Sequence, residues 1–297
     1  MQQTGVLSYE DIMSSRFDWK IGKSLHFGEN FCDEVDKLVE AGFDSIDFDL
    51  CKFWTDRQKE VALYESLETG LEKIRESGLY FNAVHISFGP NWDISNRDEE
   101  KRLRVVDQIK EIIERCDKFN PHTYVIHGSY GKIEDAMRQD RIRQLKRSLT
   151  EIRELTKAHI SLETLTAWGL GNTSDEIISI VDDVDGIDVC VDVNHFLQEK
   201  CEDAIKKIAH RIRTVHISDH DYITEKHWMP GEGKIDWQAT ICALEDVNYL
   251  GSWTYELGIS PTKTIDRPRN FSYADFINNA RELFNNEEIT VIGKPIK

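Results

Sequence analysis

The sequence lacks long apolar runs: no stretch approaches the roughly 18–20 apolar residues that a membrane span needs. Its first residues, MQQTGVLSYEDIMSSRFDW, have neither a basic start nor an apolar segment, so we expect no signal peptide. Proline is scarce, with six among 297 residues, and no Pro-, Ser- or Gly-rich linker divides the chain. These absences predict one domain over residues 1–297 and no membrane contact.

Paired cysteines are also missing. The chain has six cysteines, which are scattered and form no CxxC motif. Scattered single thiols are typical of a reduced compartment rather than of a disulfide framework. We therefore expect a cytoplasmic protein.

Basic residues are outnumbered, because 54 Asp and Glu stand against 37 Lys and Arg, giving a formal net charge of −17. A chain of that sign repels polyanions, so we expect no nucleic-acid partner. Neither GxGxxG nor GxxxxGKS/T follows a predicted strand, which removes the usual nucleotide-binding signatures.

What the sequence does contain is a repeated alternation of short apolar segments and longer amphipathic stretches. Eight such units predict a closed (β/α)₈ TIM barrel, with its core at about residues 20–286, rather than an open doubly wound sheet. Thr173 and Asp236 are expected to cap helices at Glu176–Val181 and Trp237–Leu244. The predicted strands are Lys20–His26, Ser45–Leu50, Tyr80–Ser87, Thr123–His127, His159–Glu163, Ile187–Val193, Arg213–Ile217 and Ser252–Leu257.

Six successive predicted strands finish in a carboxylate or an imidazole. Catalytic residues of such barrels project from the carboxyl ends of the strands. Grouped carboxylates repel one another and are costly to bury, and a divalent cation at their centre removes that cost. The strand-end residues are His85, His127, Glu163, Asp192 with His195, His216 and Glu256.

We expect Glu163, Asp192, His216 and Glu256 to bind one divalent metal ion. Three carboxylates and one imidazole form a hard, oxygen-rich set, which favours Mn²⁺, with Mg²⁺, Co²⁺ or Zn²⁺ as alternatives.

The strongest motifs are Glu163-Thr-Leu, Asp192-Val-Asn-His195, His216-Ile-Ser-Asp219 and the segment His227–Trp237, HWMPGEGKIDW. With them the sequence resembles the xylose isomerase-like TIM-barrel superfamily of sugar isomerases, epimerases and apurinic endonucleases. The resemblance implies that the four residues named above bind one metal, and that His195 contacts the oxygens of a substrate.

The resemblance also implies a mechanism of sugar isomerisation or epimerisation. Glu163 and Glu256, on opposite sides of the substrate, would move a proton next to a carbonyl through a cis-enediolate. We expect a free sugar or polyol as the substrate and, by analogy with the family, a homo-oligomer. The expected substrate-binding residues are His195, His85, His127, His227, Glu225, Trp54 and Trp168, with Trp228 as a further aromatic candidate.

Three alternatives remain open. A dehydratase acting on an inosose- or dehydroshikimate-like substrate would share the first proton abstraction. The apurinic endonucleases use three metals, and their pattern adds the groups His85, His127, Glu163 and His195, Glu225, His227. The net charge disfavours that reaction, because phosphodiester binding depends on several Lys and Arg contacts. A non-catalytic sugar-binding module would not explain two opposed glutamates around a cation.

One departure concerns the ketose 3-epimerases of the family. They carry a second glutamate six residues after the first ligand, and that position is Gly169 in this sequence. The sequence therefore disfavours a specific ketose 3-epimerase.

Overall fold

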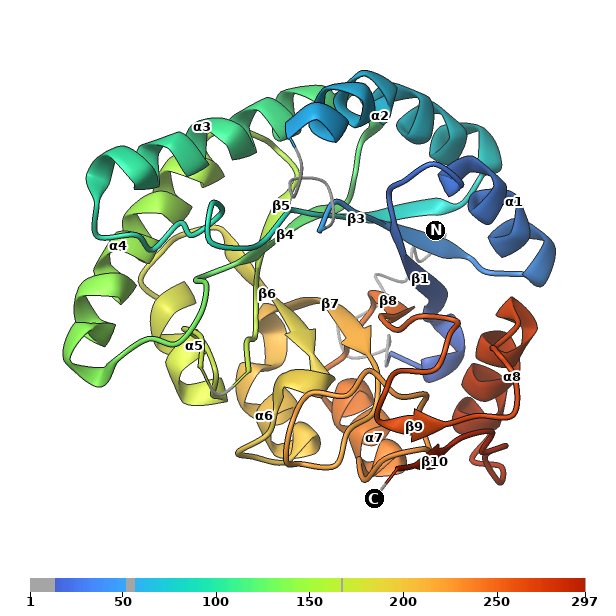
Figure 1. Ribbon diagram of the computed structural model, residues 1–297. Helices are drawn as coiled ribbons and strands as arrows, with labels where there is room; N and C mark the ends of the chain where they lie inside the picture. Colours follow the sequence, from blue (N-terminus) through green and yellow to red (C-terminus); the bar gives the residue numbers. More distant parts are fainter. Residues whose placement is uncertain (1–13, 52–56, 167, 297) are drawn as a thin grey trace, which may run out of the picture.

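The computed structural model describes residues 14–51, 57–166 and 168–296, and for residues 57–65 it describes the backbone alone. Within these ranges eight strands pair side by side in sequence order, β1 to β8, and form a closed barrel. Every neighbouring pair is parallel, and β1 closes the ring on β8 with Lys20 opposite Ser252. The predicted (β/α)₈ TIM barrel is therefore confirmed (Figure 1).

All eight predicted strands are present, and the differences are confined to their ends. Several end one to two residues before the apolar pattern does, because the last residues of that pattern belong to the loops at the barrel mouth. The strands are β1 Lys20–His26, β2 Ser45–Asp49, β3 Tyr80–His85, β4 Thr123–His127, β5 His159–Glu163, β6 Ile187–Asp192, β7 Ile212–Ile217 and β8 Ser252–Tyr255.

Helices alternate with the strands and surround the barrel (Figure 1). Thr173 and Asp236 cap two of them as expected, because their side chains accept hydrogen bonds from Glu176 N at 3.2 Å and Ala239 N at 3.0 Å. The helices are α1 Phe31–Ala41, α2 Arg57–Ser77, α3 Glu99–Cys116, α4 Asp135–Arg153, α5 Ser174–Val181, α6 Cys201–Ile208, α7 Trp237–Asp246 and α8 Tyr273–Phe284.

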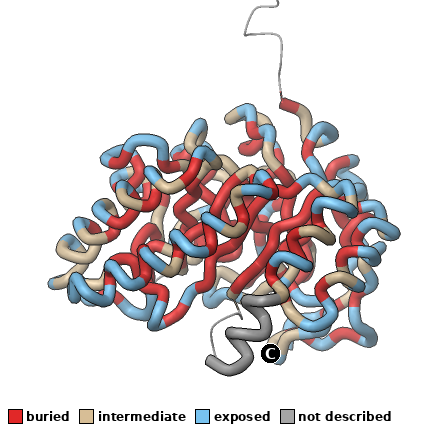
Figure 2. The backbone as a smooth tube through the Cα atoms, turned by 90° about the horizontal axis from the view of Figure 1, so that it is seen from above, coloured by how far each residue is buried: buried red, intermediate tan, exposed pale blue. Residues whose placement is uncertain are grey.

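The strands are apolar toward the helices and polar toward the barrel axis. In β2, Ile46 and Phe48 belong to the hydrophobic core, while Asp47 between them contacts polar side chains of β3 and β7. The two faces follow from the alternation of side chains along a strand. Figure 2 shows the buried strands enclosed by helices whose outer surfaces are exposed. Polar groups can thus be placed inside the barrel without weakening the layer between strands and helices.

The end of the chain holds structure that the sequence did not reveal. Past the predicted barrel core, which ends at about residue 286, β10 Lys294–Pro295 pairs antiparallel with β9 Ile265–Asp266. Strands of two residues are too short to show an alternating pattern. None of the helices in the described ranges is long and apolar enough to cross a membrane.

Candidate metal and substrate site

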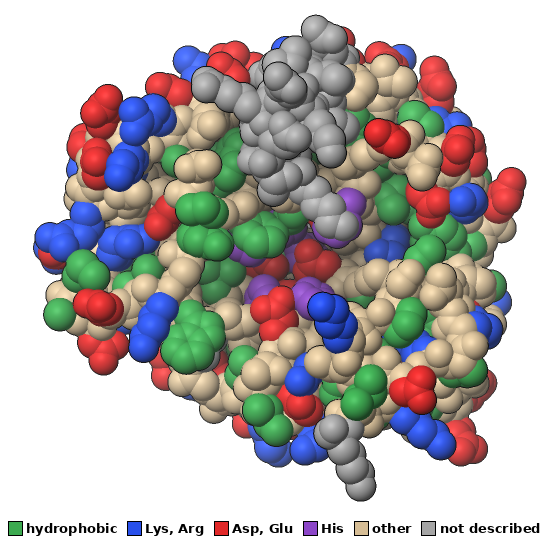
Figure 3. Space-filling view, viewed as in Figure 1, with side chains coloured by type: hydrophobic (Ala, Val, Ile, Leu, Met, Phe, Trp, Pro, Cys, Tyr) green, Lys and Arg blue, Asp and Glu red, His purple; other side chains and the backbone are tan. Residues whose placement is uncertain are grey.

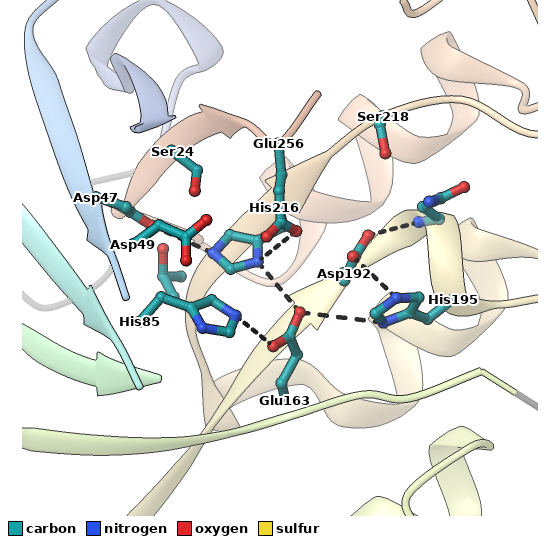
Figure 4. Close-up of polar contacts among 12 residues, drawn as sticks. Ser24, Asp47, Asp49, His85, Glu163, Asp192, His195, His216, Ser218 and Glu256 are labelled. Atoms are coloured by element: carbon teal, nitrogen blue, oxygen red, sulfur yellow. Dashed lines mark hydrogen bonds and ion pairs between the residues drawn. The ribbon is translucent and has the colours of Figure 1, made fainter. Parts of the chain in front are cut away.

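Four side chains from the carboxyl ends of β5, β6, β7 and β8 converge at the barrel mouth. Glu163, Asp192, His216 and Glu256 each offer one ligand atom, and these atoms lie within 4.8 Å of one another. Nδ1 of His216 is 3.0 Å from a Glu256 oxygen and 3.2 Å from a Glu163 oxygen. Figure 4 shows Glu163 and Glu256 reaching the group from opposite sides.

The four side chains are withdrawn from solvent. Those of Asp192 and His216 are 0 % exposed, that of Glu163 is 1 % exposed, and that of Glu256 is 18 % exposed. Burial raises the pKa of Asp192 to about 7, and the nearby carboxylates of Glu256 and Glu163 act in the same direction, while His195 opposes them. Crowded carboxylates of this kind compete for protons unless a cation neutralises them.

The donor set fits a divalent cation. Three carboxylates with one imidazole provide oxygen-rich coordination, and their convergence at 4.8 Å or less leaves one shared point between them. Glu163, Asp192, His216 and Glu256 are thus the residues that would hold the metal.

His85 and His127 lie together beside Glu163. The Nε2 atoms of the two histidines are 2.9 Å and 2.8 Å from the same oxygen, Oε2 of Glu163. Burial opposes protonation of His85, but the adjacent Glu163 carboxylate outweighs it and raises the pKa of His85 to about 9. His127 lines the cavity that opens at this end of the barrel. His85 is 1 % exposed and is not among the described residues that line that cavity. The structure therefore places His85 against the Glu163 carboxylate rather than at the cavity wall.

A second pair of histidines faces Glu225. Oε1 of Glu225 lies 2.6 Å from Nε2 of His227 and 3.7 Å from Nε2 of His195. The other ring nitrogens donate to backbone carbonyls, Nδ1 of His195 to Thr164 at 2.6 Å and Nδ1 of His227 to Glu256 at 2.8 Å. These bonds fix the orientation of both rings, and Nε2 of His195 also lies 3.3 Å from Oδ2 of Asp192.

A cavity of about 590 Å³ opens at this end of the barrel, and two of the four convergent side chains, Glu163 and Glu256, line it. Its base is acidic and rich in histidine, which is visible as red and purple atoms in the central hollow of Figure 3. The cavity has room for a small organic molecule. Of the expected site residues, those that line it are His127, Glu163, His195, Glu225, His227 and Glu256.

The loop after β7 is held by one buried carboxylate. Asp219 accepts hydrogen bonds from the backbone N–H groups of Gly231 at 2.9 Å, Gly233 at 3.0 Å and Ile235 at 3.1 Å, and from Nε1 of Trp237 at 2.9 Å. A Cβ atom at Gly233 would lie 2.2 Å from Oδ1 of Asp219, so this position requires glycine. The PGEG segment therefore folds around Asp219, and this fixes the loop that carries Glu225 and His227.

Sequence reasoning missed Lys23, which lies on β1 and lines the same cavity. The residue is 5 % exposed, and its ammonium donates to the backbone oxygen of Ser24 at 2.6 Å. Burial lowers the pKa of Lys23 to about 8, although Glu256 and Asp49 oppose that change. A lysine at the centre of the predicted strand Lys20–His26 was the available signal.

The predicted aromatic residues have different outcomes. Trp54 lies outside the described residues. Trp168 is 58 % exposed, lies against Lys132 and is not among the described residues that line the cavity. Trp228 is buried, and its Nε1 donates to Thr264 at 3.0 Å. The placement of Trp168 and Trp228 thus adds no support for a sugar-stacking role.

Comparisons with known structures agree with this fold. The chain is similar to a D-tagatose 3-epimerase-like protein, with 19 % identity, 90 % of this chain and 98 % of the other covered, and a TM-score of 0.71. It is similar to 3-keto-D-glucoside 4-epimerase from E. coli, with 21 % identity, coverage of 89 % and 99 %, and a TM-score of 0.68. D-Psicose 3-epimerase from Clostridium cellulolyticum H10 gives 19 % identity, coverage of 81 % and 86 %, and a TM-score of 0.66.

A search of curated protein sequences gave no match. The family model for the xylose isomerase-like TIM barrel, in contrast, matches residues 35–275, which is most of the chain. That range contains Glu163, Asp192, His216, Glu256 and the loop after β7. The chain belongs to the xylose isomerase-like TIM barrel family.

Proposed function

We propose that this protein is a divalent-metal-dependent sugar isomerase or epimerase, with Mn²⁺ as the preferred ion. The observation that carries the proposal is the convergence of Glu163, Asp192, His216 and Glu256 within 4.8 Å at the base of a cavity sized for a small molecule. The similar structures of ketose 3-epimerases and of a 3-keto-D-glucoside 4-epimerase support a keto sugar as the substrate class.

Glu163 and Glu256 are the proposed acid–base pair. They approach the site from opposite sides (Figure 4), so a carbon between them would present its proton to one and its vacant face to the other. A bound divalent cation would act as a Lewis acid on the neighbouring carbonyl and make that proton more acidic. Glu163 or Glu256 then removes the proton and leaves a cis-enediolate of the sugar.

The second half of the reaction decides the product. Return of the proton to the neighbouring carbon interconverts an aldose and a ketose, whereas delivery to the opposite face of the same carbon inverts its configuration. His127 and His195 line the cavity beside these glutamates, and we assign them to the oxygens of the substrate. Glu225 and His227 would cover the sugar from the loop after β7.

Gly169 bears on the carbon at which an epimerase of this kind would act. A Cβ atom at this position would lie 2.7 Å from two carbons of the Leu165 side chain, and the Gly169 oxygen accepts a hydrogen bond from Arg138 at 2.7 Å. The glutamate that ketose 3-epimerases carry here is therefore not accommodated without movement of Leu165. We favour an isomerase, or an epimerase that acts at a carbon other than C3.

Deuterium wash-in tests the proposal. Metal-reconstituted protein is incubated in D₂O with a panel of free ketoses, 3-keto glucosides and inososes, and the products are analysed by NMR and mass spectrometry. Deuterium next to the carbonyl together with a new isomer supports the proposal. Loss of water with an enone chromophore assigns the dehydratase, and absence of both reactions across the panel rejects the proposal.

Phosphodiester cleavage is the second candidate, and one observation favours it. The histidine pairs His85 with His127 and His195 with His227 flank the four convergent side chains. The first pair lies against one oxygen of Glu163. The second pair lies within 3.7 Å of one oxygen of Glu225, and His195 is also 3.3 Å from Asp192. The net charge of −17 weighs against a nucleic-acid substrate. Metal analysis separates the two: one ion per chain supports the sugar enzyme, whereas three ions and nicking of abasic plasmid DNA support the endonuclease.

The six cysteines bear on the compartment. All six are free thiols, which supports a reduced, cytoplasmic location.

A further inference from the structure

Asp47 on β2 is a buried carboxylate that the proposed reaction does not use. It is 0 % exposed and lies beside His216, one of the proposed metal ligands. Among the described residues, no Lys or Arg forms an ion pair with it, and its ion-pair partner is His216. A buried charge is costly unless hydrogen bonds compensate it, so the contacts of Asp47 indicate its role.

The first contact joins Asp47 to a proposed metal ligand. Oδ2 of Asp47 lies 3.2 Å from Nε2 of His216, while the opposite ring nitrogen, Nδ1, faces Glu163 and Glu256 at 3.2 Å and 3.0 Å. Figure 4 shows His216 between Asp47 on one side and the glutamates on the other. The contact places a carboxylate oxygen, a hydrogen-bond acceptor, opposite Nε2, so Nε2 is the ring nitrogen positioned to donate a proton to Asp47.

The second contact holds Asp47 itself. Nδ2 of Asn82 donates to Oδ1 of Asp47 at 2.6 Å and also to Oγ1 of Thr214 at 3.0 Å. All three side chains are 0 % exposed. Thr214 lies on β7, two residues before His216, so Asn82 links the strand of the carboxylate to the strand of the imidazole.

A β-bulge places Asn82 in this position. Ile46 pairs with Phe81 and Asp47 with Ala83, so Asn82 is the extra residue of β3. A bulge redirects a side chain at the expense of regular pairing, and bulges are frequent beside active sites. The bulge therefore coincides with Asn82, the residue of β3 whose side chain contacts Asp47.

We infer that Asp47, held by Asn82, is a positioning residue that fixes His216 with its proton on Nε2 and with Nδ1 facing Glu163 and Glu256, where the metal would be held. Carboxylates that accept from the second nitrogen of a ligating histidine orient the ring and strengthen it as a ligand. The inference rests on the metal site of the proposed function, but not on the identity of the sugar or of the reaction.

The test measures Zn²⁺ affinity and the His216 ring, and it needs no substrate. Zn²⁺ binding is measured by competition with a chromogenic chelator for the wild type, Asp47→Asn, Asp47→Ala and Asn82→Ala. We expect a loss of about 10- to 100-fold in affinity for Asp47→Ala. Asp47→Asn, which keeps the shape and one acceptor, should lose less, and Asn82→Ala, which removes only the support of Asp47, should lose least.

Proton NMR of ¹⁵N-histidine-labelled protein gives the second readout. In the Zn²⁺ form of the wild type, the His216 ring should carry its proton on Nε2, protected from solvent exchange and assigned by its loss in His216→Gln. Asp47→Ala should remove the protection. Asp49→Asn is the matched control, because it removes a buried carboxylate from the same strand and leaves the contact of His216 with Asp47 in place.

The outcomes separate this inference from the proposed function. Wild-type Zn²⁺ affinity in both Asp47 variants, or a proton on Nδ1 of His216 in the wild type, overturns the inference even if sugars are converted. A graded loss of affinity with no turnover of any sugar supports the inference and rejects the proposed reaction. If Asp47→Ala does not fold, the Zn²⁺ affinity of Asp47→Asn and the position of the His216 ring proton in the wild type still test the inference. Failure of the wild type to bind Zn²⁺ overturns both.

Discussion

Glu163 and His216 are 53 positions apart in the chain, yet Oε1 of Glu163 lies 3.2 Å from Nδ1 of His216. The contact exists because β5 and β7 end at the same mouth of a closed barrel, with β6 between them. Glu256, from β8, reaches the same nitrogen at 3.0 Å. One imidazole nitrogen therefore lies beside two carboxylates, and this arrangement is the basis of the proposed metal site and of the proposed acid–base pair.

Replacement of either proposed acid–base residue should abolish turnover. Glu163→Gln and Glu256→Gln each remove a group that accepts or delivers the proton, and we expect kcat to fall by about 100-fold or more. The measurement is isomer formation by metal-saturated protein, with circular dichroism to confirm folding. Glu100→Gln is the control, because Glu100 is 83 % exposed and forms an ion pair with Arg104 on the helix surface. Full turnover in both glutamine variants would disprove the assignment.

Removal of the metal should abolish activity and lower stability. Chelation leaves Glu163, Asp192 and Glu256 facing one another, and their repulsion is then compensated by the neighbouring histidines and by Lys23. A ligand that binds only the folded state adds about 2.7 kcal/mol at about 100-fold excess over its Kd, so Mn²⁺ should raise Tm. Thermal unfolding with EDTA and after addition of Mn²⁺ measures both effects. Equal Tm values and persistent activity under EDTA would argue against a metal enzyme.

The loop after β7 should depend on Asp219. Asp219→Asn replaces an oxygen by an NH₂ group that points at N–H donors, so buried hydrogen bonds are lost. We expect the free energy of unfolding to fall by about 2–3 kcal/mol. Chemical denaturation measures the change. Asp175→Asn, at a 79 % exposed carboxylate, should change it by no more than about 0.5 kcal/mol, and a similarly small change at Asp219 would contradict the role given to it.

Acid should destabilise the protein partly through His220. This residue is 0 % exposed, its Nδ1 accepts a hydrogen bond from Tyr222 N at 3.0 Å, and burial lowers the pKa of His220 to about 4. The unfolded chain, with the ordinary pKa of about 6.5, binds more protons below that value. Stability should therefore fall as the pH drops from about 6.5 to about 4, by up to roughly 3 kcal/mol from this residue.

The free energy of unfolding across that pH range tests the effect. His220→Asn should flatten the dependence, whereas His210→Asn, at an exposed position, should leave its slope unchanged. An identical slope in wild type and His220→Asn would remove His220 from the explanation.

The sequence predicted the barrel and the convergence of the four proposed metal ligands because both leave local signals. Each strand is an apolar run, and each ligand follows such a run directly, so the topology alone brings Glu163, Asp192, His216 and Glu256 together. The loop motif after β7 was also visible. The structural reason for the glycine at position 233, the close approach of its backbone to Asp219, became visible only in the structure.

Other parts of the site had no local signal. In the sequence, Asp47 fits the regular alternation of a strand and gives no sign of its contacts. Its partners Asn82 and His216 lie on two other strands. The bulge that re-aims Asn82 changes the pairing without changing the apolar pattern of β3. Lys23 lines the cavity because the closed barrel places β1 next to β8, a pairing that the sequence does not show locally. Contacts of this kind depend on register across the barrel, which periodicity does not specify.

The most direct test of the central claim is an anomalous-difference electron-density map from crystals soaked in Mn²⁺. The account predicts a peak in the space bounded by Glu163, Asp192, His216 and Glu256, with a ligand atom of each within about 2.0–2.4 Å. A fully occupied peak elsewhere, or no peak between these four side chains at saturating Mn²⁺, would contradict it.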